Sequence, residues 1–128
     1  MIILRDEEKV NALPIYIDPM QAAVITYIRE RKTIERPITV DVVSLISKAL
    51  DAELEEVIIN EVKEGVFYAK LVLKKNEKII SIDVRPSDAI AISVNEDLPI
   101  FCSKNVMDEA GVDFSSIRGA VSNDTEEI

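Results

Sequence analysis

The spacing of hydrophobic and polar residues along the chain changes between two periods, and each period predicts a different element. Residues 2–4 and 13–17 are short apolar runs on either side of a polar turn, which predicts a β-hairpin. Asp18 and Pro19 then have the residue types of a helix N-cap and first helical position. Apolar residues recur every three or four positions after them, so we expect a helix that ends before Pro37.

The helical period also predicts the buried face of the first helix and the apolar stripe of the second. In the first helix the expected buried face consists of Met20, Val24, Tyr27, Ile28 and Arg31. Thr39 is a suitable N-cap for a second helix, and Asp41 falls in its first turn, where a carboxylate stabilises the N-terminus. The expected apolar stripe of this helix consists of Val42, Ile46, Ala49 and Leu50.

The middle of the chain alternates with period two and predicts three strands, at residues 57–62, 66–73 and 78–84. Two-residue breaks with turn-forming residues separate them, which is typical of an antiparallel meander. The third strand is expected to bury Ile80, Ile82 and Val84. That alternation places Asp83 and Arg85 together on the opposite face.

The last third of the chain alternates between helix and strand. Pro86 begins a short helix, residues 98–102 read as a strand, and Ser103 caps a further helix. Helices and antiparallel strands in separate blocks predict an α+β fold, with a mixed, mainly antiparallel sheet (hairpin plus three-stranded meander) packed with about four helices. We expect a single domain over residues 1–121 and a disordered acidic tail over residues 122–128.

The composition excludes several kinds of catalytic site. The 128 residues include no histidine and one cysteine, so histidine-based triads, Cys-His pairs and the common zinc sites are excluded. Only three glycines are present, which disfavours the glycine-rich loops of nucleotide sites, and no nucleotide cofactor is expected. Any catalysis must therefore use carboxylates, Lys, Tyr, Ser or Thr, with Mg²⁺ or Mn²⁺ as the expected cofactor.

The net charge limits the partners of the chain. Fifteen Lys and Arg against twenty-four Asp and Glu give a net charge of −9, so contact with nucleic acid must come from local basic groups. The lone Cys102 forms no internal disulfide, and no apolar stretch reaches the roughly 20 residues of a membrane span. We expect a cytoplasmic protein without membrane contact.

The densest polar group consists of Asp83, Arg85, Ser87 and Asp88, at the expected junction between a strand and a helix. Two carboxylates beside an arginine suit a site that holds Mg²⁺ or Mn²⁺ and binds a phosphate. The same residues also fit an ordinary helix N-terminus, with Pro86 at the first position and a carboxylate that accepts hydrogen bonds from free N–H groups. Both interpretations agree with the spacing.

A second junction repeats the order of arginine, proline, hydroxyl and acid in Arg36, Pro37, Thr39 and Asp41. The two junctions are either two halves of one site or two independent helix starts. Lys70 belongs to a basic group on the meander, where a lysine either contacts phosphate or protects an exposed sheet edge.

Residues 83–91 resemble the signature of the bifunctional nuclease domain family. Further similarity follows in the expected order at residues 13–17, 36–41, 67–71 and 98–100. The resemblance implies a compact, often self-associating α+β domain in a family with DNase and RNase activity.

The resemblance and the polar groups together predict a nuclease-like domain with metal-dependent hydrolysis of DNA or RNA. In this hypothesis the catalytic residues are Asp83, Arg85 and Asp88, the metal ligands are Asp83, Asp88 and Asp41, and the substrate-binding residues are Arg36, Lys70 and Ser87. The alternative is a non-catalytic oligomeric binding or regulatory module, favoured by the acidic composition and by Val40, where the family commonly has histidine. The apolar helix faces predict a homodimer or a larger homo-oligomer.

Overall fold

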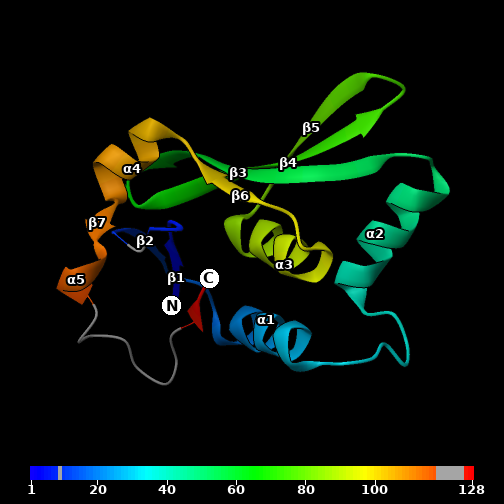
Figure 1. Ribbon diagram of the computed structural model, residues 1–128, viewed down its shortest axis with the longest axis horizontal. Helices are drawn as coiled ribbons and strands as arrows, with labels where there is room; N and C mark the ends of the chain where they lie inside the picture. Colours follow the sequence, from blue (N-terminus) through cyan, green and yellow to red (C-terminus); the bar gives the residue numbers. More distant parts are fainter. Residues whose placement is uncertain (9, 118–125) are drawn as a thin grey trace.

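Two mixed β-sheets and the helices packed between and beside them form the fold in a computed structural model, which describes residues 1–8, 10–117 and 126–128 (Figure 1). The strands are β1 (Ile2–Arg5), β2 (Asn11–Ile15), β3 (Glu53–Lys63), β4 (Val66–Lys75), β5 (Lys78–Val84), β6 (Ile100–Cys102), β7 (Val112–Asp113) and β8 (Glu126–Glu127). The helices are α1 (Pro19–Glu30), α2 (Thr39–Ala49), α3 (Pro86–Glu96), α4 (Lys104–Ala110) and α5 (Phe114–Ile117). The α+β prediction is confirmed.

The first sheet, called the hairpin sheet below, has the strand order β7-β2-β1-β8. The antiparallel pairing of β1 with β2 confirms the predicted hairpin, and β8 pairs with β1 in parallel. The backbone of Ile128 continues this pairing, because its N–H donates to the Ile3 carbonyl at 2.8 Å and its carbonyl accepts from Arg5 at 2.9 Å. Residues 122–125 of the expected tail lie outside the described residues, and β8 lies within its last three residues.

The second sheet, called the meander sheet below, has the strand order β5-β4-β3-β6. β3, β4 and β5 pair antiparallel, which confirms the predicted meander, and β6 joins β3 in parallel. Both meander turns have two residues with positive φ: Glu64 and Gly65 at 50° and 80°, and Asn76 and Glu77 at 49° and 65°. Two positive φ values in a two-residue loop define the tight turn that matches the twist of paired strands.

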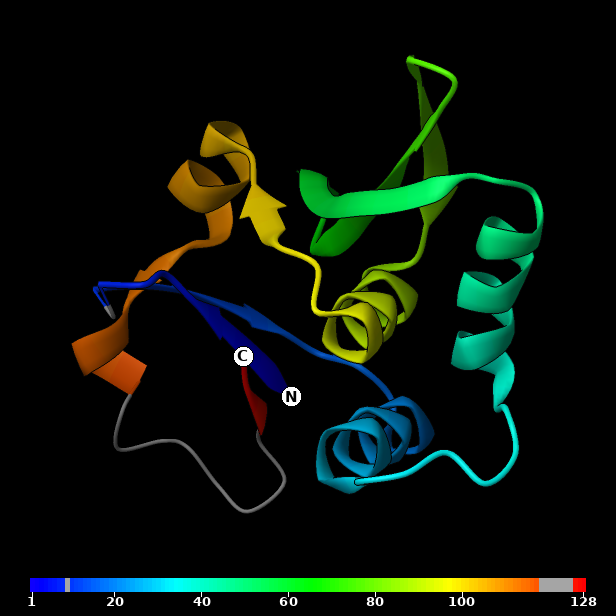
Figure 2. The ribbon, with the colours of Figure 1, turned by 45° about the vertical axis from the view of Figure 1, so that its right-hand side comes forward.

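The helix α3 lies between the meander sheet and α1, and α2 packs against one end of α3 (Figures 1 and 2). A single core joins both sheets and these helices, with Ile2 and Leu13 from the hairpin sheet, Val57 from the meander sheet, Ile25 from α1 and Ile90 from α3. Within the part of the chain that the structure describes, no helix has the length and apolar character needed to cross a membrane.

The predicted buried face of α1 is right in part. Ile28 and the Arg31 side chain are buried as expected, but Ile25 is buried as well, and Met20, Val24 and Tyr27 are exposed, Met20 by 81%. The helix begins as predicted, because the Asp18 carboxylate accepts a hydrogen bond from the Gln21 N–H at 2.9 Å. The apolar stripe of α1 therefore faces away from the core of its own chain.

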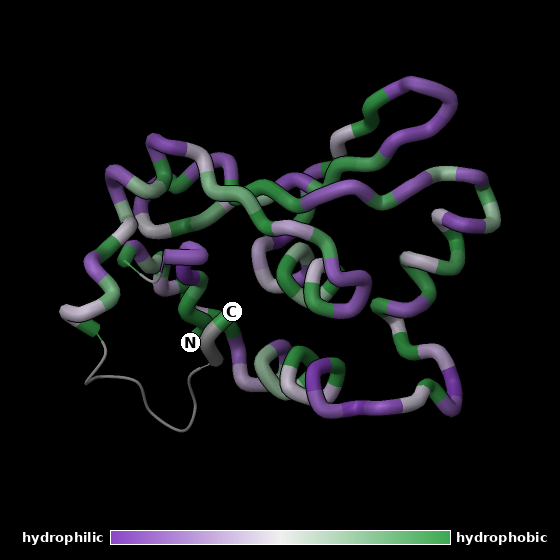
Figure 3. Tube along the Cα trace, in the orientation of Figure 1, coloured by the Kyte–Doolittle hydropathy of each residue, from purple (hydrophilic) through white to green (hydrophobic). Residues whose placement is uncertain are grey.

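The predicted apolar stripe of α2 faces away from the interior of the chain. The N-cap is Ile38 rather than Thr39, and the side chains that face the interior are Val40, Asp41, Ser44 and Ser47. The apolar stripe faces outward as Val42, Leu45, Ile46 and Leu50. Figure 3 shows hydrophobic stretches along α2, at the outer end of the molecule.

The prediction that β5 buries one face is also wrong. Ile82 lies opposite Leu71 and Ile80 opposite Leu73, so these isoleucines share the face on which Leu71 and Leu73 are buried. They remain 44% and 36% exposed because β5 is the edge strand, where the helix layer does not cover the sheet. Val84, at the end of this strand, is half-buried.

The backbone at Glu77 gives a stability prediction. A non-glycine residue at a φ of 65° is strained, so we expect Glu77→Gly to raise the free energy of unfolding by about 0.5–1 kcal/mol. Glu77→Ala is the matched control, because it also removes the exposed Lys74–Glu77 ion pair but keeps the strained backbone. Urea unfolding compares the three proteins, and equal stability of the glycine and alanine variants would contradict the prediction.

Candidate functional site

A groove of about 500 Å³ opens between α1, α2 and the junction of β5 with α3. Most of its lining is apolar and includes Val24 from α1, Val43 from α2 and Ile92 from α3. The polar lining residues are Gln21, Thr39, Arg85, Ser87 and Asp88. The groove therefore contains three of the predicted site residues and Thr39 of the second junction.

Arg85 is the N-cap residue of α3, and its side chain turns back onto the first turn of the helix. The guanidinium donates through Nε to Asp88 Oδ2 at 2.7 Å and through Nη2 to Asp88 Oδ1 at 3.1 Å. Asp88 raises the pKa of Arg85 through this paired hydrogen bond, and the Arg85 side chain remains 68% exposed. The structure thus brings together the predicted residues Arg85 and Asp88 at the surface of the groove.

Gln21 supports the same guanidinium from α1. With its amide oxygen turned toward Arg85, Gln21 accepts from Nη1 at 3.1 Å and Nη2 at 3.2 Å. In this orientation its amide nitrogen donates to Ser87 Oγ at 3.0 Å and to Asp18 Oδ2 at 3.2 Å. Asp88 and Gln21 therefore fix the orientation of Arg85 from two helices, and Ser87 belongs to the same network. These contacts use four of the five N–H donors of Arg85, so one Nη1 N–H and the positive charge remain available to a phosphate oxygen.

Asp83 and Lys70 lie on the outer face of the meander sheet. They are directly opposite each other in the pairing of β4 with β5, and Lys70 Nζ lies 3.8 Å from Asp83 Oδ1. The Asp83 side chain is 71% exposed, and neither residue lines the groove. The structure therefore places this pair beside the Arg85 junction rather than within it.

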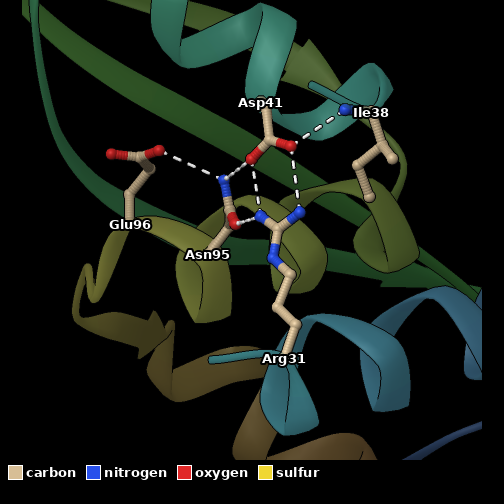
Figure 4. A network of polar contacts seen from close by, with 5 residues as sticks. All are labelled: Arg31, Ile38, Asp41, Asn95 and Glu96. Atoms are coloured by element: carbon tan, nitrogen blue, oxygen red, sulfur yellow. Dashed lines mark hydrogen bonds and ion pairs between the residues drawn. The ribbon is translucent and has the colours of Figure 1, made fainter. Parts of the chain in front are cut away.

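Asp41 faces the interior and takes part in a buried network with Arg31 and Asn95 (Figure 4). Arg31 Nη2 donates to Asp41 Oδ1 at 2.6 Å and Nη1 to Oδ2 at 3.0 Å. Asn95 Nδ2 donates to Oδ1 at 3.1 Å, and the Ile38 N–H donates to Oδ2 at 2.9 Å. Arg31 also donates to Asn95 Oδ1. Each carboxylate oxygen of Asp41 thus accepts two hydrogen bonds.

The network changes the acid–base properties of both charged partners. The hydrogen bonds from Arg31 lower the pKa of Asp41 to about 2, although burial acts in the opposite direction. The Asp41 carboxylate in turn raises the pKa of Arg31. The two side chains are 6% and 8% exposed, so this ion pair is shielded from solvent.

The predicted metal ligands Asp41, Asp83 and Asp88 do not come together around one point, as the ligands of a metal ion must. Among the described residues, no three Asp, Glu, Cys or His side chains come together in a way that suits a metal ion. Asp41 pairs with Arg31, Asp88 with Arg85 and Asp83 with Lys70. Hard divalent cations need several oxygen ligands at one point, and these carboxylates are directed to separate cations.

The two arginine–proline junctions meet in space only in part. Thr39 and Val40 line the groove that contains Arg85, whereas Asp41 turns inward to Arg31. Arg36 is exposed in the segment before α2 and does not line the groove. The second junction therefore lines the groove through Thr39, but its charged residues Arg36 and Asp41 lie outside the groove.

Sequence reasoning missed Gln21, Arg31 and Asn95. The first has a recognisable signal, because Asp18 followed three residues later by Gln21 is the pattern of a helix capping box. The other two had no such signal. Asn95 is 54 residues from Asp41 in the sequence, and Arg31 was expected to lie on an apolar face.

A larger cavity of about 630 Å³ lies between the hairpin sheet and the segment from α3 to α4. Its lining is mostly apolar and includes Leu4, Leu98, Met107 and Cys102. Burial raises the pKa of the Cys102 thiol, which disfavours its nucleophilic thiolate form. None of the predicted site residues lines this cavity, so the smaller groove remains the candidate site.

Comparisons with known proteins agree with the sequence resemblance. The family model of the bifunctional nuclease domain matches residues 2–115 of the chain. Uncharacterized proteins of Mycobacterium tuberculosis strains CDC 1551 / Oshkosh and ATCC 25618 / H37Rv are each 34% identical over 112 residues. Each match covers 88% of this chain and 66% of the relative, so the chain spans slightly less than two thirds of the length of the curated relatives it matches.

The Asp41 network gives a pH prediction. Asp41→Asn leaves the Arg31 charge buried beside a neutral amide, so we expect the free energy of unfolding at neutral pH to fall by about 3 kcal/mol. The pKa of Asp41 is lower in the folded protein than its ordinary value of 3.8. Its contribution is therefore complete above about pH 4 and is lost as the pH falls toward the folded value of about 2.

Urea unfolding between pH 2 and pH 7 measures this contribution. The control is Asp108→Asn, which removes an exposed carboxylate of α4 and is expected to keep the stability and pH dependence of the original protein. If Asp41→Asn lost stability below pH 4 as steeply as the original protein, the assigned role of Asp41 would be wrong.

Proposed function

This chain belongs to the bifunctional nuclease domain family, and we propose that it binds and hydrolyses phosphodiesters of DNA or RNA at the groove that contains Arg85 and Asp88. The observation that carries the proposal is the Arg85 guanidinium, which Asp88 and Gln21 orient at the edge of an otherwise apolar groove. An oriented and exposed guanidinium attracts a phosphate by its charge, and the Nη1 N–H that Asp88 and Gln21 leave free can donate to a phosphate oxygen.

The distribution of charge supports phosphate binding on this side of the molecule. Residues 16–50 and 66–88, which include α1, α2, β4 and β5, contain ten Lys or Arg and seven Asp or Glu. The remaining residues contain five Lys or Arg and seventeen Asp or Glu. The acidic excess therefore lies outside the segments around the groove, and a polyanion meets less repulsion there than the total of −9 indicates.

In the proposed hydrolysis, Arg85 stabilises the charge on the phosphate and Asp88 acts as the general base. A water oxygen attacks phosphorus, the bond from phosphorus to the departing sugar oxygen breaks, and that oxygen takes up a proton from solvent. Arg85 donates to the phosphate oxygens on which negative charge accumulates. Asp88 accepts the proton of the attacking water, because a carboxylate that binds arginine still has free acceptor positions.

The proposed hydrolysis is tested both with and without Mg²⁺ or Mn²⁺. Both conditions are needed because the described carboxylates do not come together as ligands of one cation. The proposal places the protein in the cytoplasm, since a chain with one cysteine has no internal disulfide to maintain.

A binding or regulatory module without catalysis is the second candidate function. The observation that favours it is the separate pairing of Asp41, Asp83 and Asp88, each with a different cation. In such a module Arg85 binds an anion and Asp88 only orients the guanidinium. The two candidates differ in one respect, which is whether Asp88 has a role in cleavage beyond binding.

The proposed function predicts that cleavage depends on Asp88. Labelled single- and double-stranded DNA and RNA are incubated with the protein in Mg²⁺, in Mn²⁺ and in EDTA. We expect Asp88→Asn to lower the cleavage rate by about 100-fold or more, as loss of a general base does. Asp108→Asn, which changes an exposed carboxylate of α4 in the same way, is expected to cleave at the original rate.

Binding is measured separately by fluorescence anisotropy with the same oligonucleotides. Arg85→Gln is expected to weaken binding by about tenfold, because it loses a charged hydrogen bond, and Arg85→Lys by less. Cleavage at the original rate by Asp88→Asn would contradict hydrolysis at this groove. Binding that depends on Arg85 without cleavage under any condition would support the binding module instead.

A further inference from the structure

We propose that a single strand of nucleic acid runs from the site groove along the inner face of β5 to a second phosphate site, which Lys75 and Lys78 form beside the β4–β5 turn. The inner face is the side of the meander sheet on which Leu71 and Leu73 are buried. The inference rests on the proposed function, because the groove holds the strand through Arg85, and it names the form of nucleic acid that the site takes.

The first observation is that Lys75 and Lys78 oppose each other. They are directly opposite in the antiparallel pairing of β4 with β5, and they flank the two-residue turn. Directly opposite side chains of paired strands point to the same face of the sheet, and like charges in this position destabilise the pairing. An anion between the two ammonium groups removes this repulsion. The pair therefore favours a bound phosphate more strongly than a lone surface lysine does.

The second observation separates this pair from the other lysines of the hairpin. Lys70 and Lys74 lie on the outer face, and the Nζ of each lies 3.8 Å from a carboxylate oxygen. The carboxylate next to Lys74 is Glu77, so the acid of the turn is directed to the outer face. Lys75 and Lys78 have no ion-pair partner within the described part of the chain. Their charges therefore attract an anion without competition from a protein carboxylate.

The third observation is the surface between the groove and the lysine pair. Val84 lines the groove, and Ile82 and Ile80 follow it at every second position on the inner face of β5. Both isoleucines are exposed, because the helix layer does not cover this edge strand. Unpaired bases offer apolar faces to such side chains, whereas a duplex keeps those faces stacked inside its helix. The exposed isoleucines therefore favour a single strand over a duplex.

The β4–β5 hairpin sets the length of the bound strand. The hairpin projects away from the helices, and its turn lies at the end opposite the junction of β5 with α3 (Figures 1 and 2). At about 3.3 Å per residue, the path from Val84 to Lys78 is about 20 Å long. A dinucleotide in the groove is too short to reach the lysine pair, and a strand of several nucleotides is needed.

The test compares two neighbouring lysines on opposite faces of β4. A labelled single strand of about 12 nucleotides, with phosphorothioate linkages that resist hydrolysis, is titrated by fluorescence anisotropy between about 50 and 200 mM salt. Lys75→Gln is expected to weaken binding about five- to tenfold at 50 mM salt. The slope of log K against log salt is expected to become shallower by about 0.7, as for one phosphate contact on a single strand. Lys74→Gln makes the same charge change on the outer face and is expected to bind as the original protein does.

Two further measurements show whether weaker binding comes from the lost phosphate contact. Lys75→Gln removes a repulsion between opposed charges, so its midpoint in urea unfolding is expected to be no lower than that of the original protein. A dinucleotide does not reach the turn, so NMR titration is expected to give the same dinucleotide affinity for Lys75→Gln and the original protein. Arg85→Gln is expected to weaken binding of both lengths.

The outcomes separate this inference from the proposed function. Equal binding of the longer strand by Lys75→Gln and Lys74→Gln would overturn the second phosphate site and leave the proposed function in place. A duplex of the same length that binds as tightly as the single strand would overturn the assignment to single strands. Absence of binding by every oligonucleotide would overturn this inference together with the proposed function.

Discussion

The buried ion pair of Arg31 and Asp41 is the interaction on which the arrangement of the three central helices depends. Arg31 follows the last turn of α1, Asp41 lies in the first turn of α2, and Asn95 lies in the last turn of α3 (Figure 4). Two charges removed from water are costly unless hydrogen bonds satisfy them, and here the carboxylate accepts four. The three helix ends are therefore held at fixed positions, because any displacement leaves a buried charge with fewer partners.

The same constraint determines the site groove and the apolar outer surface of α2. α1 and α3 run side by side, with the Arg85 network joining their first turns and the Arg31 network joining their last turns. The apolar groove lies between these two polar connections, and α2 forms its third wall. Because Asp41 draws the polar side of α2 inward, the apolar side of this helix faces solvent. One interaction thus accounts for the shape of the candidate site and for the exposed hydrophobic face beside it.

The sequence predicted the parts of the structure that local chemistry decides. The hairpin, the meander, both two-residue turns and the cap at Asp18 depend on residues close together in the chain, and these predictions are confirmed. Most of the predicted buried face of α1 is exposed, and so is the predicted apolar stripe of α2, because an apolar stripe at helical spacing does not reveal what covers it. Exposed Met20 and Ile46 show that the covering surface is not the core of the same chain.

The candidate site was predicted to a similar extent. Arg85, Ser87 and Asp88 are neighbours in the sequence, and the structure brings them together as expected. Asp41 was interpreted as a metal ligand because an acid after Arg36 and Pro37 repeats the pattern of the first junction. Its actual partner, Arg31, is ten residues away, directly after another helix, and only the folded chain shows that the two charges are paired.

Arg31 and Asp41 stabilise the fold as one unit, and a double-mutant cycle measures their coupling directly. Arg31→Met, Asp41→Leu and the double variant are compared with the original protein by urea unfolding at pH 7. Each single change leaves a buried charge without its partner, whereas the double change removes both charges. We expect a coupling energy of about 2–3 kcal/mol, with the double variant more stable than the sum of the single effects indicates. Effects that add to within about 0.5 kcal/mol would contradict the claim.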